Sequence, residues 1–355
     1  MYRPFRWGEY HVTMGIRSMQ WGEWIELDDQ YNSYHRIRKD RVERKGEKVV
    51  QVLSPLTRVR DDGEPVHIGG GAAAAIELVH ELAEYLSRRY PMTFEITRHP
   101  LMADYPAGWG GATPIKSSEK IDIQREGAEA MRIAGLLIQD DLALMIEGSD
   151  GGYYFMAGAI IVPGFWRMED KIGMNMQQIH MSGNVPQYEE KLQLSLERFF
   201  RRLAVDKPVV RNNYFVQISP PPSDTPSIDP DELAWGENVL GSEDEYGGTK
   251  GSSFGSPPVL VVTPQTLRLR TERQTLRRLP RSGAIAFTVR TYLVPVEELA
   301  QEPGIAARFA SAVRSWPEGV REYKGERRYG EVLVRYLDEM AGREKEEAEV
   351  KPYPY

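Results

Sequence analysis

The first half of the chain carries hydrophobic positions at helical spacing. Residues 72–90, which are followed by Pro91, predict an amphipathic helix. Its predicted apolar face consists of Ile76, Val79, Ala83 and Leu86. The same spacing predicts a second helix over residues 126–148. The preceding 70 residues show weak periodicity, so we expect an irregular arm that contains one charged helix at about residues 29–45.

Downstream of these helices the pattern becomes that of strands. Four segments rich in β-branched and aromatic residues predict strands over residues 153–163, 209–219, 266–279 and 284–294. The turn of a hairpin between the last two is predicted at Pro280, Ser282 and Gly283. Further helices are predicted at residues 189–205, about 303–315 and about 329–341. Because helices and neighbouring antiparallel strands segregate along the chain, we predict the α+β class, with an antiparallel sheet and flanking helices.

The chain is predicted to form one core, with an arm before it and a tail after it. We assign residues 1–70 to the arm, 71–340 to the core and 341–355 to a disordered tail. Residues 220–258 are acidic and rich in proline, glycine and serine, so they cannot bury enough apolar surface to fold alone. We expect a mobile insertion there. A lid, or a docking segment for a basic partner, is the alternative.

Composition excludes several kinds of chemistry. The 355 residues carry a net charge of −7 and include no cysteine, which excludes disulfides, cysteine-ligated iron–sulfur or zinc sites, thiolate-bound heme and a cysteine nucleophile. The negative net charge argues against nucleic-acid binding over the whole protein surface. The N-terminus has no apolar signal segment, and the apolar residues 153–166 are too short to span a membrane. We therefore expect a cytoplasmic protein.

Six arginines within residues 268–281 form the first candidate site. On a strand, Arg273 falls on the face of Leu267 and Leu269, which we expect to be buried. A buried arginine requires an anion, and guanidinium matches a carboxylate or phosphate best. The alternative is that Arg273 pairs with Glu272 or another acid of the protein. Nucleic-acid binding is a further interpretation of an arginine-rich strand, but the overall acidity weighs against it.

The second candidate is His180, one of six histidines in the chain. It follows Ile179 in a stretch that contains methionine, glycine and proline, just before a predicted helix. Its imidazole could be a buried structural group, a general base or a ligand to a cofactor. The sequence contains no Ser-His-Asp order, HExxH motif or P-loop that would decide among these roles.

A series of segments resembles one known family. The most specific is "ERQTLRRLPRSGAI" (272–285). The others include "RPFRWGEYHVTMGI" (3–16), "WIELDDQY" (24–31), "RRYP" (88–91), "QDDLALM" (139–145), "KIGMNMQQIHMSGNVPQYEEKL" (171–192) and "RNNYF" (211–215). Over roughly residues 3–340 the chain is similar to the alpha-subunit family of the heme-dependent oxidative N-demethylases, which is common in fungi.

The resemblance implies a PAS-like heme-binding domain with a histidine as the axial iron ligand. In the absence of cysteine, histidine, methionine and tyrosine are the ligands left to heme iron. The family's histidine, followed by a Val-Pro pair, corresponds to His180, Val185 and Pro186, although the spacer "MSGN" is longer here. As partners of the heme propionates we select the basic residues of the motifs nearest the implied pocket, with Arg273 and Lys171 first, followed by Arg211 and Arg281. As catalytic residues opposite His180 we select Arg278, Tyr214 and Asn213.

The resemblance also implies a reaction. O2 activated at heme would oxidise a small secondary amine and release formaldehyde, with electrons from a separate reductase that uses NADPH, flavin and an iron–sulfur centre. We expect an oxidoreductase of this type, without a nucleic-acid or membrane partner. A heme-binding sensor or carrier without turnover is one alternative, because the PAS fold serves both purposes. An arginine-rich anion-binding protein without heme is another.

Overall fold

The computed structural model describes residues 3–60, 62–96, 123–162, 167–218 and 261–350. At its centre lies one antiparallel sheet in the order β1-β7-β8-β9-β5-β6-β2. The strands are β1 Arg17–Ser18, β2 Val50–Val52, β5 Asp141–Glu147, β6 Tyr153–Ala159, β7 Val209–Ile218, β8 Leu267–Arg278 and β9 Ile285–Pro295. The predicted α+β class with an antiparallel sheet is therefore confirmed, as are four predicted strands.

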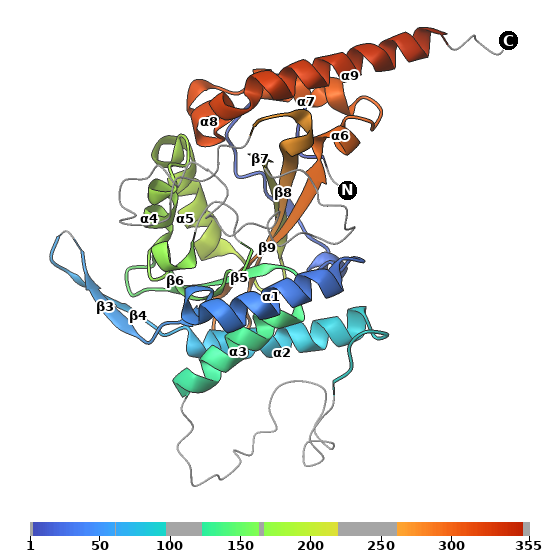
Figure 1. Cartoon of the computed structure of the whole chain (residues 1–355). Helices are drawn as coiled ribbons and strands as arrows, with labels where there is room; N and C mark the ends of the chain where they lie inside the picture. Colours follow the sequence, from blue (N-terminus) through green and yellow to red (C-terminus); the bar gives the residue numbers. More distant parts are fainter. Residues whose placement is uncertain (1–2, 61, 97–122, 163–166, 219–260, 351–355) are drawn as a thin grey trace.

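Helices α1 (Tyr31–Lys45), α2 (Ala72–Arg89) and α3 (Ile123–Leu137) lie together on one face of the sheet (Figure 1). Alternation along β5 directs Leu142 and Leu144 to this helical layer. The predicted apolar face of the second helix is rotated relative to the observed one. The fully buried stripe of α2 is Leu78, Leu82 and Leu86, whereas Ile76, Val79 and Ala83 are only half-buried.

The helix predicted over residues 126–148 is wrong in its second half. Helix α3 ends at Leu137, and residues 141–147 form β5, which pairs with β9 on one side and β6 on the other. A strand with both faces buried reads as a continuous apolar run. Periodicity alone does not separate such a run from a buried helix.

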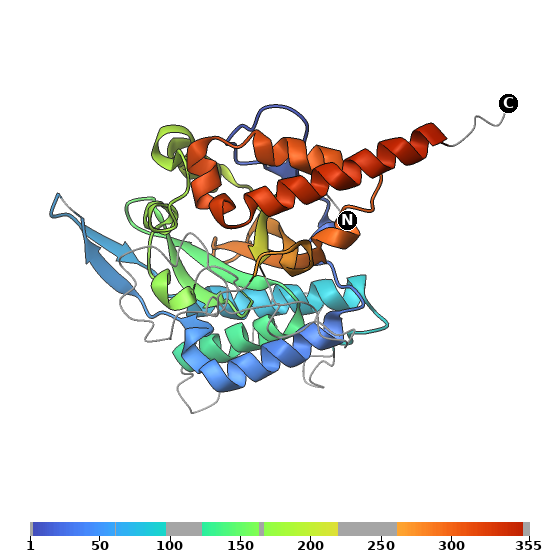
Figure 2. The same ribbon diagram turned by 45° about the horizontal axis from the view of Figure 1, so that its top comes forward.

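A second helical group covers the C-terminal part of β7 and the N-terminal part of β8, which lie side by side (Figures 1 and 2). It consists of α6 (Val296–Leu299), α7 (Ile305–Arg314), α8 (Glu318–Tyr323) and α9 (Gly330–Val350). The helix predicted to end at about 341 continues to Val350, so residues 341–350 of the tail predicted to be disordered are helical. The predicted insertion 220–258 and residues 351–355 lie outside the described residues.

The opposite face of the sheet is covered by α4 (Met176–Ser182), the π-helical turn Tyr188–Leu192 and α5 (Gln193–Arg202). The segment predicted to be an irregular arm is partly regular. It contains β2 and a projecting hairpin of β3 (Leu56–Val59) and β4 (Pro65–Ile68) (Figure 1). Among the helices of the described ranges, none has the length and apolar character needed to cross a membrane.

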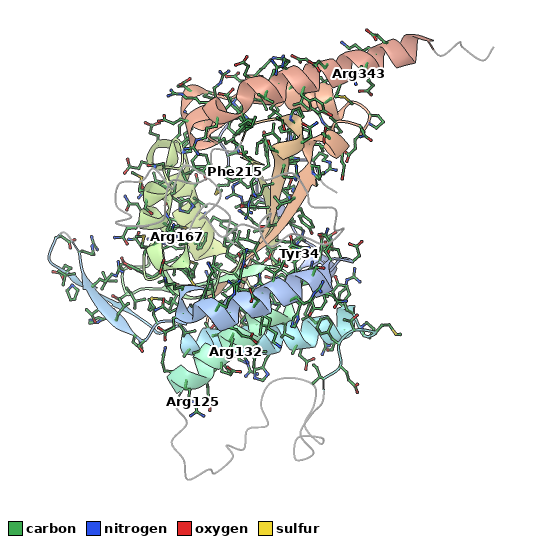
Figure 3. The ribbon with its side chains drawn as sticks, viewed as in Figure 1. Tyr34, Arg125, Arg132, Arg167, Phe215 and Arg343 are labelled. Atoms are coloured by element: carbon green, nitrogen blue, oxygen red, sulfur yellow. The ribbon has the colours of Figure 1, made fainter. Side chains whose placement is uncertain are left out.

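A buried charge network joins α1 to the sheet. Arg38 donates through Nη1 to Asp141 Oδ1 at 2.7 Å and through Nε to the Gly135 carbonyl at 2.7 Å. Tyr34, on the side of α1 toward the sheet (Figure 3), donates to the Thr291 carbonyl at 2.8 Å. The neighbouring Asp140 is fully buried, and this burial raises its pKa to about 6, against the nearby charges of Arg290, Arg273 and Arg38.

Asp140→Asn should change the pH dependence of stability. The folded-state pKa of about 6 exceeds the ordinary value of 3.8, so ionisation of Asp140 destabilises the folded state as pH rises from about 4 to 6. Over this window the variant should gain about 3 kcal/mol in the free energy of unfolding relative to wild type, measured by urea unfolding. The exposed Asp206→Asn serves as control. Parallel pH profiles for wild type and Asp140→Asn would contradict the assignment.

Candidate functional site

A cavity of ≈ 300 Å³ lies between the sheet and helices α4 and α5. Residues of the N-terminal arm between Tyr10 and Ile16 and the end of α8 complete its lining. Its volume is within the range of small-molecule and cofactor sites, about 300–1,000 Å³. Its walls are largely apolar and include Ala143, Met145, Phe155, Ile179, Leu192 and Leu196. The cavity therefore has the composition expected for an apolar ligand with a few polar contacts.

His180 lies in the cavity lining, in the last turn of α4. The helix begins with a capping box, in which Asn175 accepts from the Gln178 amide at 2.8 Å and Gln178 accepts from the Asn175 amide at 3.1 Å. Four residues after Met176, the His180 ring places Nδ1 2.7 Å from the Met176 carbonyl. A carbonyl only accepts, so Nδ1 carries the proton and Nε2 keeps its lone pair.

The environment of His180 keeps the ring neutral. Burial lowers its pKa to about 4, although the bond to the Met176 carbonyl acts in the opposite direction. The ring stacks on Tyr188, with centroids 4.7 Å apart and an angle of 8° between the planes. An oriented, neutral imidazole with a free Nε2 is the form that binds metals. His180 can therefore act as a metal ligand without first losing a proton.

The loop that follows His180 has an unusual backbone. Asn184 and Gln187 adopt left-handed conformations with φ of 50° and 57°, which few residues other than glycine adopt. A π-helical turn follows at Tyr188–Leu192; both features concentrate at functional sites. Val185 and Pro186, the Val-Pro pair of the sequence signature, line the cavity.

Two predicted cationic residues lie in the same cavity as His180. Lys171 is buried, and its Nζ donates to Ser182 Oγ at 2.8 Å. Arg211, on β7, presents a buried Nε that has no hydrogen-bond partner among the described residues, and burial lowers its pKa. The charges of both residues contribute to the lowered pKa of His180. The structure therefore brings together His180, Lys171 and Arg211, and it adds the predicted Asn213, which also lines the cavity.

Sequence reasoning missed two charged residues of this cavity. Glu272, on β8, accepts from Arg270 Nε at 3.2 Å and from Gln274 Nε2 at 3.0 Å. It is the one acid of an arginine-rich strand, which is a signal that could have been used. Lys324 follows α8 and is buried. No local pattern marks Lys324, because a lysine between two helices is usually exposed.

Arg273 lies on the face of the sheet opposite His180. Its neighbours on β8, Glu272 and Gln274, line the cavity, so alternation turns Arg273 away from it. Its guanidinium pairs with Glu26 at 3.2 Å and donates to the Trp24 carbonyl at 3.2 Å. The structure therefore favours the alternative interpretation, in which Arg273 pairs with an acid of the protein, although that acid is Glu26.

Three other predicted site residues do not line the cavity. Arg278 donates to the Leu203 carbonyl at 2.7 Å and to the Tyr153 hydroxyl at 2.9 Å, so it anchors the end of α5 to the sheet. The Arg281 amide, in the β8–β9 turn, donates to Glu77 at 2.7 Å. The Tyr214 side chain packs on the face of the sheet opposite the cavity, where its hydroxyl accepts from Trp316 Nε1 at 3.3 Å.

Most of the chain matches one family of known proteins. The family described as "Haem-dependent oxidative N-demethylase, alpha subunit-like" matches residues 15–334. This range includes α4 with His180, strands β5 to β9 and the end of α8, and thus the cavity apart from the first part of the arm. The chain belongs to the haem-dependent oxidative N-demethylase alpha-subunit-like family.

Proposed function

We propose that this chain is a heme-dependent oxidoreductase that demethylates a secondary amine with O2 and releases formaldehyde. The observation that carries the proposal is the neutral His180, oriented through Nδ1, in the lining of an apolar cavity. Family membership supports the dependence on heme. An antiparallel sheet with the cavity on one face supports a PAS-like fold for the heme-binding domain. A separate reductase with NADPH, flavin and an iron–sulfur centre would supply electrons.

The residues present fit heme. His180 offers a neutral nitrogen to iron, and the bond from Nδ1–H to the Met176 carbonyl holds the ring in one tautomer. The apolar walls suit a porphyrin, and Arg211, whose buried Nε has no partner among the described residues, suits a propionate. Lys171 is the second cation for this role. When bound, heme would supply the activation of O2 and the acceptance of electrons.

The chain's own residues would orient the amine and exclude water. The apolar wall formed by Phe155, Leu276 and Phe287 keeps the cavity dry. Glu272 offers a carboxylate to the N–H of an amine, and Asn213 offers an amide that both donates and accepts. The amine must present a lone pair, so it reacts as the neutral base. Arg278 and Tyr214 would act only indirectly, by holding α5 and the β7 layer in place.

Hemin titration followed by an amine assay tests the proposal. The purified protein should bind hemin with a Soret band of histidine-ligated heme. With a surrogate reductant it should then consume O2 and release formaldehyde from a secondary methylamine. Turnover should rise with pH toward the pKa of the amine, because the neutral fraction rises. Hemin binding without formaldehyde at any pH at which the protein is folded would favour the sensor or carrier alternative. Failure to bind hemin would contradict both.

A further inference from the structure

Lys324 is a buried cation that has no acidic partner among the described residues. It follows α8, is 6 % exposed and lines the same cavity as His180. Its Nζ donates to the Tyr214 carbonyl, which is its one hydrogen bond among the described residues. The ammonium lies 4.4 Å from the ring centroid of Tyr214 and 4.5 Å from that of Phe215, which Figure 3 marks. An ammonium has three donors, and two of those of Lys324 have no hydrogen-bond acceptor among the described residues.

Burying such a charge is costly for the protein. Desolvation lowers the pKa of Lys324 to about 7, with Glu272 raising it and Arg211 lowering it further. No carboxylate of a described residue lies within the 4.0 Å of an ion pair. A buried cation that faces a cavity and lacks a protein acid indicates an anionic ligand.

The charged residues of the cavity indicate which kind of molecule carries the anionic group. Under the proposed function, Lys171 and Arg211 serve the two heme propionates, and Lys324 is left over. Glu272 lines the same cavity and makes no ion pair with Lys324, because its oxygens accept from Arg270 and Gln274. An ammonium-type group and a carboxylate therefore face one space without pairing with each other. They are complementary to a molecule that carries both an amine and a carboxylate.

We propose that the amine accepted by this chain is an N-methylated amino acid, whose carboxylate binds Lys324 and whose secondary amine binds Glu272. The inference rests on the proposed function for the identity of the reaction, but the binding of the carboxylate can be tested without heme. A plain dialkylamine suits this cavity less well. Its cation would meet Lys171, Arg211 and Lys324 with Glu272 as counterion, whereas the carboxylate of an amino acid offsets the charge of Lys324.

The test compares N-methylglycine with dimethylamine in the hemin-loaded protein, by calorimetry and by the shift of the Soret band. N-methylglycine should bind at least about tenfold more tightly, as expected for one charge-assisted hydrogen bond to a buried site. Lys324→Met should remove this preference by weakening the binding of N-methylglycine, without weakening the binding of dimethylamine. Lys324→Arg keeps the cation and should retain part of the preference. Lys207→Met changes an exposed lysine and is the matched control.

The outcomes separate this inference from the proposed function. The inference would be overturned if wild type bound dimethylamine more tightly than N-methylglycine. It would also be overturned if Lys324→Met lost affinity for both ligands equally. If hemin binds but N-methylglycine does not, the substrate class alone is wrong. If hemin does not bind, the proposed function fails. In that case the Tm of the heme-free protein tests whether Lys324 binds a carboxylate. The Tm should rise with N-methylglycine in wild type but not in Lys324→Met. An unchanged wild-type Tm would contradict carboxylate binding at Lys324.

Discussion

His180→Ala should lose the spectrum of histidine-ligated heme while the protein stays folded. Among the described residues His180 is the one histidine in the cavity lining, and its Nδ1 is already engaged by the Met176 carbonyl at 2.7 Å. Groups that only orient a metal ligand contribute about 10–100-fold to metal affinity, so loss of the ligand itself should exceed about a hundredfold. Hemin titration followed by the Soret band measures this, and far-UV circular dichroism checks the fold.

Two further measurements sharpen the test of His180. Exogenous imidazole should restore the histidine-type spectrum of His180→Ala, because the substitution leaves space for a free imidazole ring in the cavity lining. His80→Ala changes an exposed histidine on α2 and should leave the spectrum as in wild type. An unchanged Soret band in His180→Ala would show that another residue binds the iron.

Strands β6 to β9 could be predicted because β-branched and aromatic residues mark them and turn residues end them. The hairpin of β8 and β9 was predicted at the observed place, where Gly283 adopts a φ of 70°. Strand β5 could not be predicted, because its leucine, methionine and isoleucine side chains are buried on both faces and suit a buried helix equally well. The predicted apolar face of α2 differed from the observed one because half-buried residues of this helix also pack on the core.

For the residues of the candidate site, the burial of a side chain was easier to predict than the face of the sheet on which it lies. Arg273 is buried, as alternation on β8 predicted, but both faces of this strand are buried. Burial therefore did not reveal which face holds the cavity, and Glu272 rather than Arg273 lines it. The ligand role of His180 rested on resemblance, since residue chemistry left three roles open. Lys324 meets Tyr214 across 110 positions of sequence, and no local pattern records a contact of that range.

Arg211 and Arg273 provide a matched pair of variants, because they lie on two neighbouring strands, β7 and β8, and on opposite faces of the sheet. Arg211→Met should weaken hemin binding by about 1.5–3 kcal/mol, the range for a charge-assisted hydrogen bond lost from a buried site. Arg273→Met should leave hemin affinity unchanged and lower the Tm instead, since it breaks the contacts with Glu26 and the Trp24 carbonyl. Competition for hemin with a second heme-binding protein measures both affinities.

The dimethyl ester of heme identifies the group that Arg211 contacts. The ester lacks the negative charge of the propionates, so wild type and Arg211→Met should bind it with similar affinity if Arg211 pairs with a propionate. Arg211→Lys should recover only part of the affinity for hemin, because an ammonium cannot form the two parallel bonds of guanidinium. Equal losses in Arg211→Met and Arg273→Met would contradict the placement of heme on the His180 face. Since Arg211 Nε is buried without a partner among the described residues, Arg211→Met should also raise the Tm of the heme-free protein, and this readout does not depend on the cofactor.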